Sequence, residues 1–456
     1  MDDYRRIADR IADDIAAGRL GPGQRLAPQR LFARRHGIAG STAGRVYGEL
    51  VRRGLVVGEV GRGTFVRAAA AGPAGRALTE EATRAPVNLE LNYPSAPGQS
   101  ELLAPALAPL LRPDVLAESL RPAAATGTAE ARAAAAALLA APGWRPDPAQ
   151  LLFTGNARQA VAAALASLVR PGGRVGVEEL TYPLVKEIAA RLGIVLVPLA
   201  TDADGLRPES LAAAHRSAPL SALYLQPVLH NPTSVTTPPE RRRRIARAVT
   251  DLGLPVVEDR VWSFLCPGDT PFAAGAPGLT HVVDGLSKRV APGLTAGFLV
   301  VPPARVESVA AAVRSGGWSA GRFALEAAVR WAGDGTVRRL VAAKRADAAR
   351  RQDVVARELA GFAVRTDPHS CFVWWDLPAP WRADTFTAAA AAHGIAVTPG
   401  PAFAVDPGRT PDAVRLGLAS VSETELTRAL RTLAGTARTG GGRTGGGRTG
   451  GGEDGA

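Results

Sequence analysis

Residues 284–300 read DGLSKRVAPGLTAGFLV and contain Lys288, one of only three lysines in the chain. The others are Lys186 and Lys344, and arginine carries nearly all of the remaining positive charge. An arginine keeps its proton in a protein, whereas a desolvated lysine can lose its proton and attack a carbonyl group. We therefore predict that Lys288, which stands before a small-residue turn and an apolar strand, is a reactive lysine. An ordinary exposed lysine in a loop is the alternative.

The composition limits the class of protein. A chain of 456 residues suggests two or three domains, and a net charge of +12 favours an anionic partner such as nucleic acid. Cys266 and Cys371 provide neither a disulfide framework nor metal-ligand spacing, so we expect a reducing compartment and no metal site. Because no signal peptide and no membrane-length apolar run is visible, we expect a cytoplasmic protein without membrane contact.

The first 67 residues form a small basic module with 13 arginines against seven acidic residues. Ile7, Ile11 and Ile15 recur at helical spacing, which predicts a helix over residues 4–18. A second helix is predicted to begin at Pro28 and end at Gly37, and residues 40–42 are expected to cap a third. Short strands follow at 55–57 and 64–66. Three helices and a two-stranded wing predict a winged helix-turn-helix.

The segment LAPQRLFARRHGIAGSTAGRVYGELVRRGLVVGEVGRGTFV, residues 26–66, resembles the DNA-binding domain of GntR-family transcription regulators. In such a domain the third helix enters the major groove of double-stranded DNA. The residues expected at base edges are Ser41, Thr42 and Arg45; those expected at phosphates are Arg30 and Arg34; and Arg62 is expected at the minor groove. The family often has Ser-Arg where Ala39 and Gly40 stand, so no operator sequence carries over. A solvated arginine-rich face is the alternative.

Two segments are predicted to lack a packed core. Residues 68–86 are rich in Ala, Gly and Pro and are expected to form a linker. Residues 436–456 end in a Gly-rich repeat and are expected to form a disordered tail.

Residues 87–435 alternate short apolar runs with Ala-rich helical stretches, which predicts an α/β domain with a mostly parallel sheet. The predicted strands are Leu151–Phe153, Val175–Val177, Ile194–Pro198, Ala222–Leu225, Pro255–Val257, His281–Asp284 and Ala296–Val301. In such sheets the ligand lies beyond the carboxyl ends of the strands. The loops that follow these runs therefore matter most.

Several of these loops carry polar residues in an informative order. After the first strand, Asn156, Ala157 and Arg158 open a helix, whose N-terminus can bind a phosphate. Tyr182, Asn231 and Asp259 follow later strands, Ser287 and Lys288 come next, and Arg415 lies near the end of the domain. Taken singly, Asp259 could cap a helix, Tyr182 could lie in the core and Arg415 could form a salt bridge.

This order resembles fold-type I pyridoxal-phosphate enzymes of the class I aminotransferase type, and the whole chain resembles the MocR subfamily of GntR-type regulators. The resemblance implies that Lys288, preceded by Ser287, forms a Schiff base with pyridoxal 5'-phosphate. It implies that Asp259 pairs with the pyridine nitrogen and Asn231 with the phenolic oxygen. It also implies that Tyr182 stacks on the ring and that Arg415 binds the carboxylate of a ligand.

The chain departs from the family pattern where the cofactor phosphate is held. Gly285 replaces a threonine and Thr295 replaces an arginine. Val261 and Trp262 stand where a tyrosine is usual, Asn156 and Arg158 replace a glycine and a glutamine, and a tyrosine is missing before Gly127. Arg158 is the first candidate to supply a positive charge there, and Arg289 is a weaker one.

The sequence therefore predicts a homodimeric transcription regulator that reads repeated half-sites. Its aminotransferase-like domain would bind pyridoxal phosphate or an amino-compound effector and so change operator affinity. Two alternatives stay open. One is an active pyridoxal-phosphate-dependent aminotransferase with a DNA-binding appendage, and the other is a regulator whose large domain has lost the cofactor and binds another ligand.

Overall fold

The computed structural model describes residues 3–17, 19–20, 24–53, 55–59, 63–66, 85–293 and 295–439. Arg62, most of the predicted linker and residues 440–456 lie outside this part of the chain.

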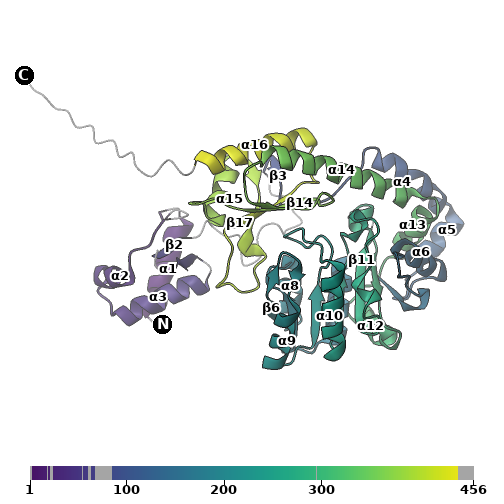
Figure 1. The fold of residues 1–456 in the computed structure, drawn as a ribbon, viewed down its shortest axis with the longest axis horizontal. Coiled ribbons are helices and arrows are strands. Elements are labelled where there is room, and N and C mark those ends of the chain that lie inside the picture. Colours follow the sequence, from purple (N-terminus) through teal and green to yellow (C-terminus); the bar gives the residue numbers. More distant parts are fainter. Residues whose placement is uncertain are drawn as a thin grey trace, which may run out of the picture.

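The N-terminal unit is a winged helix-turn-helix (Figure 1). It consists of α1 (Asp3–Ala16), α2 (Gln29–His36), α3 (Gly40–Arg52) and the antiparallel strands β1 (Val56–Glu59) and β2 (Gly63–Val66). Ile7, Ile11, Val46, Tyr47 and Leu50 form its core. Gly37 ends α2 with φ 61°, a left-handed conformation that favours glycine. The predicted three helices and wing are confirmed.

The predicted cap of the third helix is wrong in detail. Ala39, in an extended conformation, is the N-cap of α3, and it makes no side-chain cap hydrogen bond. The helix begins at Gly40, so Ser41 and Thr42 lie inside its first turn. Their hydroxyl groups therefore lie on the helix surface rather than at its boundary, with Ser41 exposed and Thr42 partly exposed.

A seven-stranded sheet forms the centre of the large domain, and all seven predicted strands are confirmed. Its order is β4 (Leu151–Thr154), β12 (Gly297–Val300), β11 (Thr280–Gly285), β10 (Val256–Asp259), β9 (Ala222–Leu225), β5 (Arg174–Glu178) and β6 (Val195–Leu199). Within this sheet β12 runs in the opposite direction to the other strands, and it pairs antiparallel with β4 and β11. The sheet is therefore mostly parallel, and the ends of β5, β9, β10 and β11 meet at one edge.

Helices cover both faces of this sheet (Figure 1). One apolar cluster joins the sheet to α7 (Ala157–Leu168), α8 (Pro183–Arg191) and α12 (Val306–Ser315). Two further clusters join it to α6 (Ala129–Leu139), α13 (Arg322–Gly333) and α14 (Thr336–Glu358), and to α9 (Pro208–Ser217) and α10 (Pro239–Asp251). Buried Ala side chains along α7 let that helix lie close to the strands.

The chain continues into a second, smaller sheet of the order β13 (Val364–Arg365), β14 (Phe372–Asp376), β17 (Ala413–Gly417) and β16 (Thr398–Pro399). Its core also includes residues of α14, α15 (Ala383–Ala392) and α16 (Glu423–Thr439). Near the start of the domain, β3 (Val87–Asn88) pairs with β15 (Ile395–Ala396). Since α16 continues to Thr439, the first residues of the predicted tail are helical.

The remaining helices α4 (Gln99–Leu107), α5 (Pro113–Ser119) and α11 (Leu286–Arg289) are short. None of the helices in the described ranges is both long and apolar enough to span a membrane.

Candidate cofactor site

Lys288 lies on α11, directly after β11, at the sheet edge where the strand ends meet. Its Nζ donates to the carbonyl oxygen of Asn92 over 2.7 Å. The same Nζ lies 4.1 Å from the ring centre of Tyr93 and 5.2 Å from that of Trp262. Lys288 is therefore a partly buried lysine between two aromatic rings, and the alternative of an ordinary exposed loop lysine does not hold.

The surroundings of Lys288 make its amine a usable nucleophile. Burial, together with the smaller effect of the nearby positive charges of Arg158 and Arg415, lowers its pKa to about 7. A pKa of about 7 leaves a large part of the amine neutral at neutral pH. A neutral amine is the form that attacks a carbonyl group.

The other two lysines fix backbone segments. Lys344 is fully buried, and its Nζ donates to the carbonyl oxygens of Lys288 (3.0 Å) and Val290 (2.7 Å). Lys186 donates in the same way to two carbonyl oxygens of the 402–404 turn. Lys344 therefore holds the turn that presents Lys288, a role that the sequence did not reveal.

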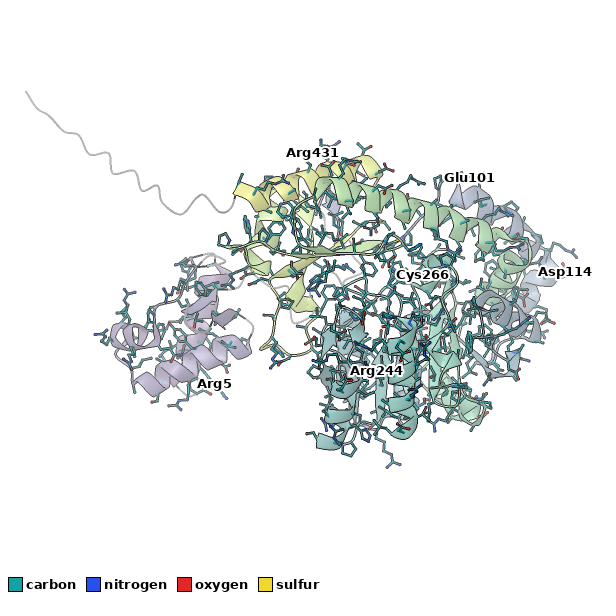
Figure 2. The ribbon with its side chains drawn as sticks, viewed as in Figure 1. Arg5, Glu101, Asp114, Arg244, Cys266 and Arg431 are labelled. Carbon is teal, nitrogen blue, oxygen red and sulfur yellow. The ribbon has the colours of Figure 1, made fainter. Side chains whose placement is uncertain are left out.

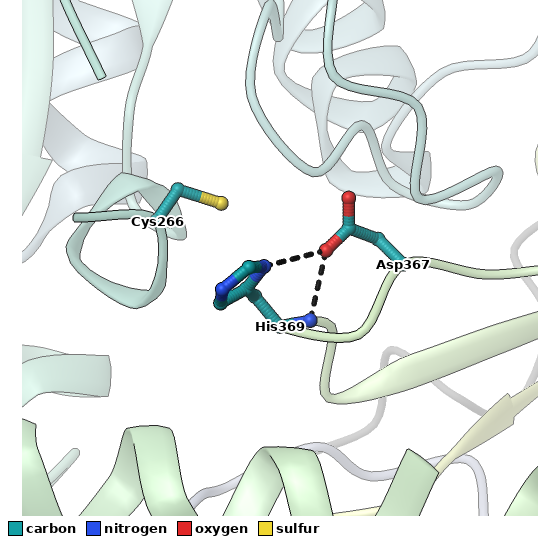
Figure 3. A group of neighbouring side chains, drawn as sticks. All are labelled: Cys266, Asp367 and His369. Atoms are coloured by element: carbon teal, nitrogen blue, oxygen red, sulfur yellow. Dashed lines mark hydrogen bonds and ion pairs between the residues drawn. The ribbon is translucent and has the colours of Figure 1, made fainter. Parts of the chain in front are cut away.

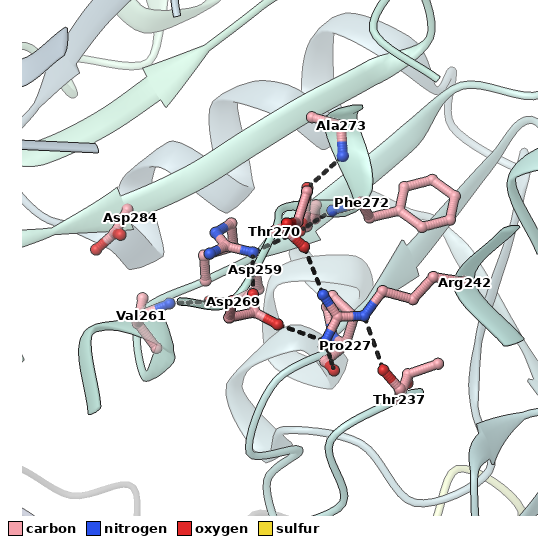
Figure 4. A network of polar contacts seen from close by, with 12 residues as sticks. Pro227, Thr237, Arg242, Asp259, Val261, Asp269, Thr270, Phe272, Ala273 and Asp284 are labelled. Carbon is pink, nitrogen blue, oxygen red and sulfur yellow. Dashed lines mark hydrogen bonds and ion pairs between the residues drawn. The ribbon is translucent and has the colours of Figure 1, made fainter. Parts of the chain in front are cut away.

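Asp259 ends β10 and is buried. Its Oδ2 accepts hydrogen bonds from the Tyr224 hydroxyl (2.7 Å) and from Nε2 of Gln226 (3.0 Å), and its Oδ1 accepts one from the N–H of Val261 (3.1 Å). Figure 4 shows the last of these bonds. Burial raises its pKa to about 6. The carboxyl group is thus held rigidly and is poised to share a proton with a bound base.

Asn231 and Tyr182 lie near this carboxylate. The N–H of Asn231 donates to Oε1 of Gln226 over 3.3 Å, which ties it to the residue that holds Asp259. The Oδ1 of Asn231 is buried without a hydrogen-bond partner among the described residues. Tyr182 precedes α8; burial raises its pKa, with smaller effects from Arg158 and Asp259. The structure therefore brings these predicted site residues into one neighbourhood.

One wall of the site is formed by the start of α7 and by the hydroxyls of Ser287 and Thr295. Asn156 caps α7, and its side chain accepts the N–H of Gln159 over 3.0 Å, so Ala157 and Arg158 occupy the first turn. The hydroxyls of Ser287 and Thr295 lie 2.8 Å apart. Helix N-termini bind anions through their backbone N–H groups. This wall can therefore hold a phosphate even though Thr295 has replaced the arginine.

The close packing behind this wall depends on two glycines. Gly285 and Gly297 face each other across β11 and β12, and Gly297 also pairs with Thr154 of β4. A Cβ added to Gly285 would lie 2.9 Å from the carbonyl oxygen of Ala296, and one added to Gly297 would overlap the backbone of Asn156. The two glycines thus let the strands approach the start of α7.

Arg289 does not contribute to this wall. Its guanidinium pairs with the buried carboxylate of Asp284 and lies 5.4 Å from the ring centre of Phe264. The sequence-based suggestion that Arg289 could grip a phosphate is therefore wrong, because its charge is already matched by Asp284.

Arg415 lies on β17 and is buried. One of its terminal nitrogens donates to the carbonyl oxygen of Glu90 and to Oγ1 of Thr398, and its Nε is buried without a hydrogen-bond partner in the described ranges. Burial lowers its pKa to about 10. The negative charge of Glu90 also acts on Arg415. Since the hydrogen bonds of the guanidinium go to a carbonyl and a hydroxyl oxygen, it is able to bind the carboxylate of a ligand.

Several residues of this site could not be recognised from the sequence. Asn92 and Tyr93 precede every predicted strand of the sheet, and both side-chain amide atoms of Asn92 are buried without hydrogen-bond partners in the described structure. In the sequence, Trp262 is a replacement for a tyrosine and Tyr224 is typical of an apolar strand. Gln226 carries no side-chain chemistry that points to a site. Tyr224 lies on β9 and Gln226 follows this strand directly, and this position was the only signal.

The predicted DNA-binding residues lie on the helices of the N-terminal unit. Arg30 and Arg34 on α2 are exposed, as are Ser41 and Arg45 on α3. The guanidinium of Arg45 lies 5.3 Å from the ring centre of Tyr4 on α1. Arg62 falls outside the described residues.

Two family profiles match the chain. Residues 121–433 match the aminotransferase class I and II profile. The chain belongs to the aminotransferase class I and II family. Residues 3–66 match the profile of bacterial regulatory proteins of the gntR family, so the aminotransferase domain follows a GntR-type helix-turn-helix domain. The chain therefore has the architecture of MocR-type proteins.

Curated relatives match the chain over most of its length. An uncharacterized HTH-type transcriptional regulator of Bacillus subtilis, YdeF, is 29% identical over 91% of this chain and 90% of its own length. The uncharacterized HTH-type transcriptional regulator YdcR of Escherichia coli is 25% identical over 88% of this chain and 92% of its own length. The HTH-type transcriptional regulator TauR of Rhodobacter capsulatus is 27% identical over 67% and 69%.

Solved structures confirm the aminotransferase fold type I. An archaeal alanine:glyoxylate aminotransferase superimposes with a TM-score of 0.71 at 20% identity, over 77% of this chain and 90% of its own. An α-aminoadipate aminotransferase of Thermus thermophilus, complexed with N-(5'-phosphopyridoxyl)-L-leucine, gives 0.70 at 22% identity, over 78% and 93%. At these identities the likeness concerns the fold.

Proposed function

We propose that this protein is a DNA-binding transcription regulator whose aminotransferase domain binds pyridoxal 5'-phosphate and an amino-compound effector. One observation carries the proposal. In a single chain, a GntR-type winged helix precedes an aminotransferase domain in which hydrogen bonds hold Lys288 and Asp259. Relatives named HTH-type transcriptional regulators match nearly the whole chain, which supports a regulatory role.

Several independent observations support a fit between the residues around Lys288 and the proposed cofactor. Lys288 offers an amine whose pKa is about 7, and Asp259 is fixed by three hydrogen bonds. Asn231 and Asn92 present buried polar atoms without hydrogen-bond partners among the described residues. Burying such atoms costs free energy unless a ligand or water satisfies them.

When bound, pyridoxal phosphate supplies an aldehyde that combines with amines and a ring that withdraws electrons. The Lys288 amine is the group that can attach to it, Asp259 can share a proton with the ring nitrogen, and Tyr182 can cover the ring. At the other end, the first turn of α7 and the hydroxyls of Ser287 and Thr295 can bind the phosphate.

Arg415 indicates what kind of effector the pocket takes. A buried guanidinium whose hydrogen bonds go to a carbonyl and a hydroxyl oxygen favours a planar carboxylate, which it can bind through two parallel hydrogen bonds. An effector with both an amino group and a carboxylate would reach Lys288 and Arg415 together. We therefore expect an amino acid or a related amino carboxylate.

The regulatory step we propose is a change in DNA affinity through linkage. Two copies of the chain would form a dimer, and the two winged helices would read repeated half-sites. An effector that binds one arrangement of the large domains better shifts the population toward it. The shift would change the spacing of the winged helices, and DNA would in turn change effector affinity by the same factor.

The test starts with selection of an operator from a random DNA library by the full-length protein. Fluorescence anisotropy then measures affinity for this DNA with and without pyridoxal phosphate, for the wild type and for Lys288→Ala. We expect pyridoxal phosphate to change the affinity of the wild type at least fivefold and to leave Lys288→Ala unchanged. Selection of no sequence, or equal affinities of the wild type under both conditions, would refute the proposal. Sustained keto-acid formation from amino donors would instead indicate an aminotransferase.

A further inference from the structure

A second cluster of ligand-type side chains lies outside the pocket of Lys288. Cys266, Asp367 and His369 each offer one ligand atom, and these atoms all lie within 4.8 Å of one another (Figure 3). Nδ1 of His369 lies 3.0 Å from Oδ1 of Asp367, which also accepts the N–H of His369 over 2.8 Å. The Asp367 carboxylate therefore orients the imidazole within the cluster.

The three residues come from different parts of the fold. Cys266 follows the 3-10 turn η4 (Ser263–Leu265), which continues from β10 of the seven-stranded sheet. Asp367 and His369 lie in the connection between β13 and β14 of the smaller sheet. Figure 2 shows Cys266 between these two parts of the large domain. The cluster therefore exists only when the two sheets are assembled, and the sequence spacing of its members gave no sign of it.

A thiolate, an imidazole and a carboxylate are the three side chains that bind zinc in proteins. Together they suit a borderline-soft divalent cation better than magnesium or calcium, which prefer oxygen ligands alone. His369 is about half exposed, so an ion could reach the site and keep a water molecule as its fourth ligand. Cys266 and Asp367 are partly buried, which holds their positions.

Asp367, rather than Asp269, is the carboxylate that is able to bind a metal ion. Asp269 also lies near Cys266, but it forms ion pairs with Arg242 (2.6 Å) and Arg260 (3.0 Å), as Figure 4 shows in part. Binding of a cation would release the Cys266 thiol proton to solvent as the metal–sulfur bond forms.

We propose that Cys266, Asp367 and His369 bind one zinc-class divalent cation that joins the two sheets of the large domain. Both ligand segments lead directly to the pocket. Trp262, which faces Lys288, precedes η4, and Phe372, at the start of β14, lies 5.6 Å from Trp262 between ring centres. An ion at this joint would fix the wall against which Lys288 packs. The site does not depend on the proposed regulatory function.

The experiment uses the purified full-length chain after treatment with a chelator. Cobalt(II) is added, because cobalt bound to a thiolate gives a charge-transfer absorbance band in the near ultraviolet and substitutes for zinc. We expect one equivalent of cobalt per chain to produce the band, and zinc to remove it by displacement. Cys266→Ser should abolish the band, and His369→Ala should weaken cobalt binding at least tenfold.

Two matched variants serve as controls. Cys371→Ser changes the other cysteine, which is buried, and His393→Ala changes an exposed histidine at the end of α15. Both should keep the band and the affinity of the wild type, and circular dichroism should show that every variant is folded. The proposal is overturned if the wild type gives no band, if Cys266→Ser retains it, or if His369→Ala binds cobalt as tightly as His393→Ala does.

Discussion

The hydroxyl of Tyr224 lies 2.7 Å from Oδ2 of Asp259, and both side chains are buried. Tyr224 lies on β9 and Asp259 at the end of the neighbouring strand β10, so the parallel pairing of these strands sets this bond. Burial favours the protonated carboxyl and raises its pKa to about 6, while the bonds from Tyr224, Val261 and Gln226 favour the ionised form. Tyr224 therefore helps to set the proton affinity of the group expected to face the cofactor ring.

The first prediction concerns Tyr224→Phe, which removes this hydrogen bond and leaves the ring in place. The folded carboxyl binds a proton more tightly than the unfolded one, whose pKa is near 3.8, so the free energy of unfolding falls as pH rises toward about 6. In the variant the pKa should rise further, and the fall should extend to higher pH. Urea unfolding from about pH 4 to about pH 8 measures this shift.

Asp259→Asn is the reference for that experiment, because it removes the titrating group. The part of the pH dependence that Asp259 contributes should be absent from it. Superimposable pH profiles for the wild type and Tyr224→Phe would show that the hydroxyl has no influence on the carboxyl.

The second prediction concerns the pH dependence of Lys288. Because its pKa is lowered to about 7, the rate of attachment of pyridoxal phosphate should rise up to about pH 7 and then level off. A lysine with an ordinary pKa would continue to rise in reactivity to much higher pH. Borohydride reduction fixes the attached group, and mass spectrometry of peptides identifies the lysine and its yield at each pH.

Lys288→Ala is the negative control, and Lys186 and Lys344 within the same sample are internal ones. The interpretation fails if the modified peptide contains Lys186 or Lys344, or if the yield at Lys288 keeps rising well above pH 7.

The fold was largely predictable because its signals are local. Apolar runs of strand length gave all seven strands of the main sheet, and the strand-end rule placed Asp259, Asn231 and Lys288 together. Contacts between residues that lie far apart in the sequence could not be predicted in this way. Asn92 reaches Lys288 from nearly two hundred residues earlier, and Lys344 supports it from a helix. Neither contact leaves a pattern in sequence spacing.

The departures from the family pattern show the same limit. Thr295 stands where the family has an arginine, which suggested a damaged phosphate site. The sequence could not show that the hydroxyl of Thr295 lies 2.8 Å from the hydroxyl of Ser287. The sequence also could not show that Arg289 forms an ion pair with Asp284. Such compensation depends on side-chain geometry, which residue identities alone do not determine.

The third prediction tests the carboxylate preference of Arg415. Arg415→Lys keeps a positive charge but loses the planar fork, and Arg415→Met loses both. We expect Arg415→Met to weaken binding of amino carboxylates by roughly ten- to hundredfold, since a hydrogen bond to a charged group contributes about 1.5–3 kcal/mol. Calorimetric titration with amino acids and with the corresponding amines measures the change. Equal losses for amines and amino acids would contradict a carboxylate role.

The fourth prediction separates base reading from phosphate contact in the winged helix. Arg45→Ala should weaken binding to a selected operator by about 1–3 kcal/mol and relax its sequence preference. Arg34→Ala should weaken binding to all sequences alike. It should also reduce the slope of log affinity against log salt concentration by about 1. Fluorescence anisotropy over a salt series measures both. Arg243→Ala, an exposed arginine that pairs with Glu240 on α10, is the control and should change neither.

The fifth prediction concerns the wall behind the proposed phosphate site. Gly297 lies opposite Thr154 and Gly285, and an added Cβ would overlap the Thr154 hydroxyl and the backbone of Asn156. Gly297→Ala should therefore displace the start of α7, lower the unfolding free energy by about 1–3 kcal/mol and weaken pyridoxal phosphate binding. Gly333→Ala has open space around its Cβ and should be neutral or slightly stabilising. Denaturant unfolding and absorbance titration measure both effects, and loss of stability with unchanged cofactor affinity would separate this wall from the phosphate site.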